Sequence, residues 1–248
     1  MKKEFVKDLL IFVISFILYY IFGTGLIYLI LKAIYNGNSG VFPSYLMNSE
    51  FRERGLSNIA QLISSFIILI ALGIIYFKSL KGHFSFFKDY KLIFKTMGYA
   101  LLVYFVTICY NLFLPLAGGT GEDGSNVALI KESMKQQYWI MLVLVVFLGP
   151  VIEEILFRFI PFKFLKEKMS MNMVLLITSI VFTIPHMFSL FNSNVLMGDI
   201  LALPKFLIVG WMLGSYYYKN NSIGRVILVH MLYNIISFVF MSISLSLI

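Results

Sequence analysis

Charged side chains are scarce in this chain of 248 residues: Asp, Glu, Lys and Arg together make up 13% of it, whereas about a quarter is usual in soluble globular domains. Apolar residues make up 60%, and the mean hydropathy is +0.88. These values exclude an ordinary soluble domain. They predict an integral membrane protein in which residues 1–248 form a single membrane domain.

Cysteine is almost absent as well. The lone Cys109 lies in an apolar stretch, which excludes a disulfide framework within the chain and a cysteine-based zinc site. The formal charge of +8 comes from basic residues that are scattered between apolar stretches. The sequence therefore predicts no nucleic-acid partner and indicates contact with membrane lipids that carry anionic headgroups. It makes no prediction of the oligomeric state.

Seven apolar stretches are long enough to cross a membrane, for which about 20 residues are needed. They are residues 9–31, 59–77, 96–116, 138–162, 171–191, 200–218 and 226–248. The predicted fold is all-α, a polytopic membrane helix bundle of seven to eight transmembrane helices. An eighth helix would arise if the stretch 138–162 breaks at Gly149 and Pro150, because proline interrupts helical hydrogen bonding.

The basic residues also predict an orientation, because positive loops are retained on the cytoplasmic side of a membrane. With the N-terminus inside, thirteen Lys and Arg lie in cytoplasmic segments and five in external ones. The sequence thus predicts a cytoplasmic N-terminus and, with seven spans, an external C-terminus. A composition rich in Ile, Lys, Phe and Asn favours a bacterial plasma membrane.

Six ionisable side chains lie inside the predicted spans, where each costs about 2.5 to 3.5 kcal/mol on insertion scales and is by default a functional candidate. The first three spans contain none of them. Lys205 lies near the start of its span and is expected to reach the membrane surface. The other five are candidates for an intramembrane polar site: Glu153, Glu154, Arg158, His186 and His230.

Spacing along the helices divides these groups. Glu154 and Arg158 are four residues apart, so they share a helix face and are expected to pair. Glu153 points about 100 degrees away and has no partner on its own helix, which leaves one carboxylate neutralised and one free. His230 and Asn234 are also four residues apart and present two donors side by side.

Two prolines adjoin the embedded groups, Pro150 before Glu153 and Pro185 before His186. A helix broken at Pro150 would place Glu153 near a helix N-terminus, which favours the carboxylate form. The predicted span limits put Glu153, His186 and His230 about 15, 22 and 6 Å from the cytoplasmic end at 1.5 Å per residue. Because these three residues would otherwise lie at different depths, a break at Pro150 is also expected to bring them into one site.

Three short clusters follow one another along the chain: EEILFR at 153–158, FTIPH at 182–186 and HMLYN at 230–234. They resemble the EExxxR, FxxxH and HxxxN signatures of the CPBP family of intramembrane proteases, the CAAX protease and bacteriocin-processing enzymes also called Abi. The resemblance covers residues 150–234 with the motifs in family order on separate predicted helices. It implies that residues 138–241 form the catalytic core of an intramembrane endopeptidase.

The resemblance also implies a role for each motif position. Glu153 would be the general base that activates a water molecule, and His186 would help to orient that water. Glu154, paired with Arg158, would hold the site together. This mechanism needs no cofactor, and an unpaired carboxylate is what a general base requires.

By the same resemblance, His230 and Asn234 would donate hydrogen bonds to the developing oxyanion. A metal-dependent version of the protease is the alternative, in which Glu153, His186 and His230 would bind zinc or another divalent metal. The sequence has no HExxH motif, and the metal-free mechanism is the favoured interpretation.

The expected substrate is a membrane-associated peptide or protein precursor. Because the composition is of a bacterial kind, peptide maturation or self-immunity is favoured over the processing of prenylated protein tails. Two other functions stay open. One is a proton-coupled transporter that relays protons through Glu153, Arg158 and His186, although transporters often have two similar halves and the embedded charge here lies in one half. The other is a membrane scaffold or immunity protein that keeps these residues without catalysis.

Overall fold

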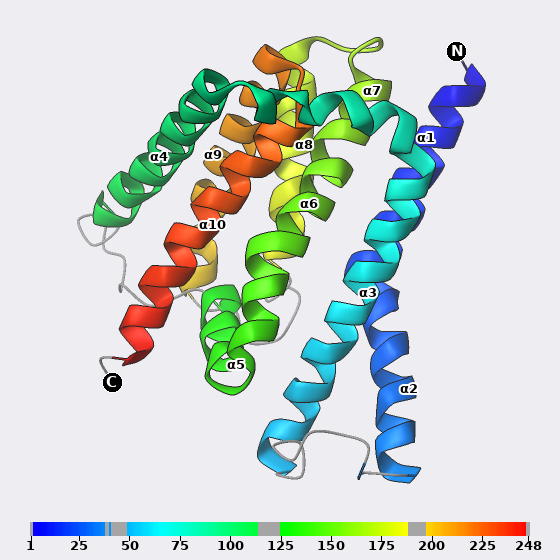
Figure 1. Cartoon of the computed structure of the whole chain (residues 1–248), viewed down its shortest axis with the longest axis vertical. Coiled ribbons are helices and arrows are strands. Elements are labelled where there is room, and N and C mark those ends of the chain that lie inside the picture. The colour runs from blue at the N-terminus through cyan, green and yellow to red at the C-terminus, as the bar shows by residue number, and fades with distance from the viewer. Residues whose placement is uncertain (1, 38–39, 41–48, 114–124, 188–196, 247–248) are drawn as a thin grey trace.

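The computed structural model of the chain describes residues 2–37, 40, 49–113, 125–187 and 197–246, and within these residues it consists of helices with no strand (Figure 1). A seventh, shorter apolar helix, Met171–His186, accompanies six described helical runs that are long and apolar enough to cross a membrane: Lys3–Gly37, Arg52–Lys88, Tyr90–Phe113, Asn126–Leu165, Asp199–Asn220 and Ile223–Ser246. The prediction of an all-α polytopic membrane bundle is confirmed.

Two long rods and a connecting segment form the N-terminal half. The first rod consists of α1 (Lys2–Ile17), the π-helical turn η1 (Leu18–Phe22) and α2 (Gly23–Gly37), and α2 packs along the second rod, α3 (Ser49–Leu80). The 3-10 helix η4 (Lys81–Lys88) then crosses one end of the bundle to α4 (Tyr90–Phe113), as Figure 1 shows.

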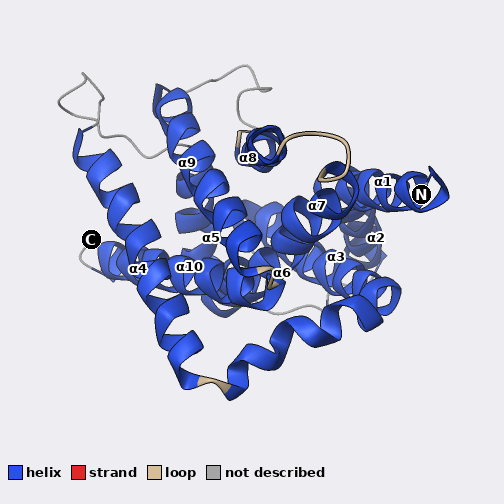
Figure 2. Ribbon diagram, turned by 90° about the horizontal axis from the view of Figure 1, so that it is seen from above, coloured by secondary structure: helices blue, strands red, loops and turns tan. Residues whose placement is uncertain are grey.

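The C-terminal half is arranged around one long helical run that passes through the middle of the molecule (Figure 2). This central run consists of α5 (Ser125–Leu142), η6 (Val143–Leu148), α6 (Gly149–Glu154), η7 (Ile155–Phe159) and α7 (Ile160–Leu165). α8 (Met171–His186) packs against α9 (Met197–Asn220), and α10 (Ile223–Ser246) packs against α4, η6 and α6. From outside the central run, α10 and α3 pack against α6, and α8 packs against η7.

The central run does not break at Gly149 and Pro150, and the prediction of a break there is wrong. Gly149 has helical dihedral angles (φ −53°, ψ −59°), and its N–H donates to the Leu144 carbonyl across a π-turn. The residue with non-helical angles is Gln137 (φ −139°, ψ 56°). The central run is therefore not divided into two spans at Pro150, and Glu153 does not lie at a free helix N-terminus.

Proline has a local effect in α8 instead. The described helix ends at His186, directly after Pro185, and Met187 leaves the helical region (φ −116°, ψ 19°). The helix α8 thus ends five residues before the predicted span 171–191 does. Residues 188–191 of that span lie outside the part of the chain that the structure describes.

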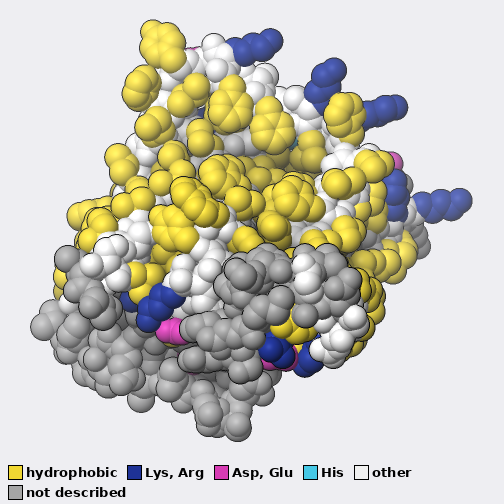
Figure 3. Space-filling view, turned by 60° about the horizontal axis from the view of Figure 1, so that its bottom comes forward, with side chains coloured by type: hydrophobic (Ala, Val, Ile, Leu, Met, Phe, Trp, Pro, Cys, Tyr) yellow, Lys and Arg dark blue, Asp and Glu magenta, His cyan; other side chains and the backbone are white. Residues whose placement is uncertain are grey.

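The two ends of the bundle differ in what they hold. α1 begins at the end where η4, α7 and the α9–α10 connection lie, and α10 ends at the opposite end (Figure 1). This arrangement agrees with an odd number of crossings. Hydrophobic side chains cover most of the described surface seen in Figure 3, and Lys and Arg lie at its margins.

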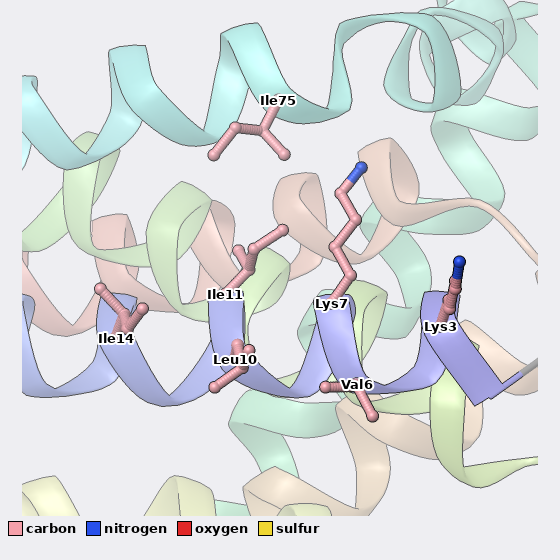
Figure 4. A pocket seen from close by; sticks show the side chains of 7 residues that line it. All are labelled: Lys3, Val6, Lys7, Leu10, Ile11, Ile14 and Ile75. Atoms are coloured by element: carbon pink, nitrogen blue, oxygen red, sulfur yellow. The ribbon is translucent and has the colours of Figure 1, made fainter.

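An apolar groove of about 630 Å³ lies between α1 and α3. Lys3 and Lys7 line it near the start of α1, and aliphatic side chains of α1 line the rest together with Ile75 of α3 (Figure 4). This groove lies on the outside of the bundle and is separate from the embedded polar groups, so it belongs to the lipid-facing surface.

Candidate active site

The central run carries two adjacent glutamates in different environments. Glu154 and Arg158 are both 0% exposed and form a salt bridge of 2.8 Å between Oε1 and Nη1. The Glu153 side chain keeps 15% of its surface exposed, and no described Lys or Arg pairs with it. The predicted division into one neutralised and one free carboxylate is present in the structure.

Arg158 is held by three different groups. Besides the salt bridge, its Nη2 donates to the Gly210 carbonyl at 3.1 Å, and its guanidinium carbon lies 4.4 Å from the centroid of the Phe182 ring. Gly210 permits α9 to approach α8 closely at this point, since a Cβ atom there would lie 3.1 Å from the Cα of Ser179. The partner, the hydrogen bond and the ring contact offset much of the cost of burying this charge, while Arg158 Nε and Glu154 Oε2 are buried without a hydrogen-bond partner among the described residues.

His230 lies between the two carboxylates. Its Nδ1 is 2.7 Å from Glu154 Oε1, and its Nε2 is 3.8 Å from Glu153 Oε2. Because a salt-bridged carboxylate only accepts hydrogen bonds, Nδ1 is the donor toward Glu154. The 3.8 Å distance exceeds a hydrogen bond, so Nε2 and Glu153 face each other without direct bonding.

Asn234 ties α10 to the central run through a backbone carbonyl. Its Nδ2 donates to the carbonyl of Val145 at 2.8 Å. In a π-turn, residue i donates to residue i−5, so the natural donor to Val145 is residue 150, a proline without an N–H. The amide of Asn234 therefore replaces the missing proline donor, which explains how the run stays helical through Pro150.

His186 has a defined tautomer when neutral. Its Nδ1 lies 2.8 Å from the Phe182 carbonyl, and since a carbonyl only accepts, Nδ1 carries the proton and Nε2 keeps its lone pair. The ring packs between Phe182 and Phe206, at centroid distances of 4.7 and 4.4 Å. Glu153 and His230 lie near enough to act electrostatically on it.

Phe182 is a residue to which the sequence assigned no role. Its ring contacts Arg158, His186 and His230, the last at a centroid distance of 5.9 Å. It is 1% exposed. Phe182, the first position of the FxxxH motif, therefore provides an apolar surface that Arg158, His186 and His230 share. The motif is the sequence feature from which its role could have been inferred.

Tyr20 is a second residue that the sequence gave no reason to select. It lies in the π-turn η1 of the first rod, its ring packs 6.0 Å from Phe157, and Glu153 lies in its electrostatic range. Its hydroxyl is buried without a hydrogen-bond partner among the described residues. No motif marks this position, because the tyrosine lies in an apolar run more than 130 residues before Glu153.

Three π-helical turns surround this polar cluster: η1, η6 and η7. π-turns are uncommon and occur frequently at functional sites. In η6 the turn frees the Val145 carbonyl for Asn234, and η7 begins directly after Glu154 and contains its salt-bridge partner Arg158. The depths that differed by residue counting are thus brought together by local changes of helical pitch and by shifted helix limits, with no break at Pro150.

The six predicted site residues therefore belong to one cluster built from the central run, α8 and α10. Among the described residues, no group of three or more His, Cys, Asp or Glu side chains is arranged so that it would hold a metal ion. His230 directs Nδ1 to Glu154, and its Nε2 lies on the side of Glu153.

The fold and this cluster define a polytopic membrane protein with a buried carboxylate and histidine site. Residues 135–236 match the family model described as type II CAAX prenyl endopeptidase Rce1-like. This segment is thus similar to the CAAX protease family that the motifs resemble, and the match supports a CAAX-type intramembrane endopeptidase. Comparisons with curated proteins and with solved structures give no match. All six predicted site residues lie in the matched segment.

Proposed function

We propose that Glu153 is the general base of a glutamate-dependent intramembrane endopeptidase. One observation carries the proposal: of two adjacent buried carboxylates, Glu154 is fixed by Arg158 and His230, whereas Glu153 has no such partner and keeps a partly exposed side chain. A general base must accept a proton during the reaction. A carboxylate already committed to a guanidinium is poorly suited to that step, so the free one is the better base.

The proposed reaction is hydrolysis of a peptide bond. Glu153 removes a proton from a water molecule, the hydroxide adds to the carbonyl carbon, and Glu153 returns the proton to the leaving amine as the C–N bond breaks. The Nε2 lone pair of His186 accepts a hydrogen bond from the same water and so orients it. The cycle consumes the peptide bond and one water molecule, and it regenerates the Glu153 carboxylate.

His230 and Asn234 are the proposed donors to the oxyanion. His230 is held by Glu154 through Nδ1, and its Nε2 lies on the Glu153 side, where a proton on Nε2 would be the donor to the oxyanion. The Asn234 amide has a second N–H beyond the one given to Val145. Donors fixed in a low-dielectric site stabilise a developing charge more than water does.

The proposed substrate is a membrane-associated peptide precursor in a bacterial plasma membrane, with the cytoplasm on the side where α1 begins. Support comes from the bias of basic residues toward that end and from the composition. Maturation or self-immunity is therefore proposed ahead of processing of prenylated tails. We propose the metal-free mechanism, in which no step is assigned to a metal, and activity in the presence of a strong chelator is the expected result.

The test uses the full chain in proteoliposomes with fluorescence-quenched membrane peptides, both unprenylated precursors and prenylated CAAX tails. Glu153→Gln is expected to reduce kcat by about a thousandfold, within the usual range for removing a general base. Glu167→Gln, an exposed carboxylate on the same run's terminal loop, is the matched control and should leave kcat unchanged. Cleavage by Glu153→Gln at the wild-type rate would overturn the base assignment; cleavage of prenylated tails alone would overturn the substrate assignment.

A further inference from the structure

A second polar region lies at the end of the bundle where α1 begins, away from the candidate active site. There the α9–α10 connection meets η4 and the start of α4, and together they enclose a cavity of about 310 Å³. This is the lower end of the size range of ligand pockets. Its polar lining includes His83, Ser85, Asp89, Asn220, Ser222 and Arg225.

Arg225 is the buried charge of this cavity. It is 6% exposed, and each guanidinium nitrogen donates to a neutral oxygen: Nε to Thr96 Oγ1 at 3.1 Å, Nη1 to Asn220 Oδ1 at 2.6 Å, and Nη2 to the Tyr216 hydroxyl at 2.7 Å. Among the described residues, no carboxylate lies within ion-pair distance of it. The side chain is positioned rigidly, but its positive charge is not compensated by an anion of the chain.

Other features raise the positive potential here. Arg225 is the third residue of the 24-residue helix α10, so it adds to the positive end of the helix dipole instead of offsetting it.

The start of α10 is held against η4 by a hydrogen bond. The Ile223 N–H donates to His83 Nδ1 at 3.4 Å, and so in a neutral His83 the proton is on Nε2. Gly224 lets this helix start press against η4, since a Cβ there would lie 2.6 Å from the His83 carbonyl oxygen.

Asp89 is the acidic member of the lining, and its carboxylate is used locally. Its Oδ1 accepts from the N–H groups of Lys91 and Leu92 at 2.9 and 3.4 Å, which caps the start of α4, and the side chain is exposed. Exposed lysines lie on both sides in the sequence, Lys88 and Lys91. The local balance of charge around the cavity therefore remains positive.

We propose that this cavity binds the phosphate of an anionic membrane lipid, with Arg225 as its charge partner. Arginine binds phosphate through charge-assisted, often bidentate hydrogen bonds, and the cavity lies at a bundle end, the level at which headgroups reside in a membrane. The bound lipid would join η4, α4 and α10 at the point from which α10 leads to His230. This site is independent of the proposed hydrolysis and stands if that proposal fails.

The test is native mass spectrometry of the full chain with phosphatidylglycerol, phosphatidylcholine or inorganic phosphate as probes. One phosphatidylglycerol is expected to remain bound to the wild type. Arg225→Gln should weaken its binding about tenfold, the loss of roughly one charge-assisted interaction, whereas the exposed control Lys219→Gln should change it less than twofold. Equal retention by Arg225→Gln would overturn the proposal.

A second measurement uses the wild type alone, so that a folding defect of the variant does not decide the result. A phosphatidylglycerol analogue with a photoreactive headgroup should cross-link within residues 82–92 or 220–225. Cross-linking elsewhere, or equal retention of phosphatidylcholine, would overturn the lipid assignment. Binding of inorganic phosphate without the lipid would show a free-phosphate site and overturn the choice of a lipid.

Discussion

The two buried arginines of the C-terminal half have opposite surroundings. Arg158 is 0% exposed and is neutralised by Glu154, which also accepts from His230. Arg225 is 6% exposed and donates only to neutral oxygens of Thr96, Asn220 and Tyr216. Burial is nearly equal, so the difference lies in the counter-charge.

The difference is that Arg158 is neutralised by a carboxylate of the chain, whereas Arg225 has no such carboxylate among the described residues and could pair with an anionic ligand. At Arg158 the charge is balanced by Glu154, and the unbalanced group is the neighbouring Glu153, the proposed base. At Arg225 the unbalanced group is the arginine itself, the proposed partner of a lipid phosphate. In a low-dielectric environment an unbalanced group is costly, and where the chain retains one, it is a candidate for function.

The largest effect on stability is expected for Arg158→Met. It leaves the Glu154 carboxylate buried without its arginine, which typically costs about 3 to 5 kcal/mol. The measurement is denaturant or thermal unfolding in defined micelles. Arg54→Met is the control, because Arg54 forms an exposed pair with Glu132 at 3.0 Å and its loss should cost less than about 1 kcal/mol.

The comparison fails if Arg158→Met costs no more than Arg54→Met. A further arm sharpens it: in the Glu154→Gln background, Arg158→Met should lose most of its effect, because no buried carboxylate remains to be left unpaired.

A smaller loss is expected for Arg225→Met in lipid-free micelles. It removes three hydrogen bonds to neutral groups but strands no carboxylate, so we expect about 1 to 3 kcal/mol. Addition of phosphatidylglycerol should raise the Tm of the wild type more than that of the variant. An equal rise in both would contradict the proposed difference between the two arginines.

The replacement of a proline donor by Asn234 can be tested with a double-mutant cycle. Asn234→Ala should cost about 1 to 2 kcal/mol, because the part-buried Val145 carbonyl loses its donor. In a Pro150→Ala background the new N–H of residue 150 supplies that donor, and the cost should fall by half or more. Additive costs in the unfolding measurement would show that the two residues do not share Val145.

The smallest effect is expected at Tyr20. Its buried hydroxyl has no partner among the described residues, so Tyr20→Phe should leave stability within about 0.5 kcal/mol of the wild type. Tyr19→Phe is the matched comparison, since Tyr19 hydrogen-bonds Ser65 and should lose about 1 kcal/mol. Unfolding of both variants in the same micelles decides between them; a larger loss for Tyr20→Phe would indicate a bonding partner.

Much of the fold was predictable, because apolar stretches of spanning length can hardly form anything but helices in a membrane. The spacing of Glu154 and Arg158 was also sufficient to predict their salt bridge, since residues four apart on a helix are neighbours. The free state of Glu153 followed from the same geometry. These are local properties of one helix, and local sequence carries them.

The helix break at Pro150 was predicted wrongly because the compensation is not local. The donor that replaces the proline N–H belongs to Asn234, which lies 89 positions away from Val145. The same holds for Gly210 as a partner of Arg158 and for Tyr20 beside Glu153. Contacts of this kind depend on how helices pack, and no periodicity within one helix reports them.

The central claim is that Glu153 reacts while Glu154 stabilises, and one paired measurement tests it most directly. For Glu153→Gln and Glu154→Gln, kcat per folded molecule and the free energy of unfolding are measured on the same preparations. We predict that Glu153→Gln loses about a thousandfold in kcat with stability within about 1 kcal/mol of the wild type, and that Glu154→Gln loses mainly stability. Wild-type turnover by Glu153→Gln, or a large loss of stability in that variant, would contradict the account.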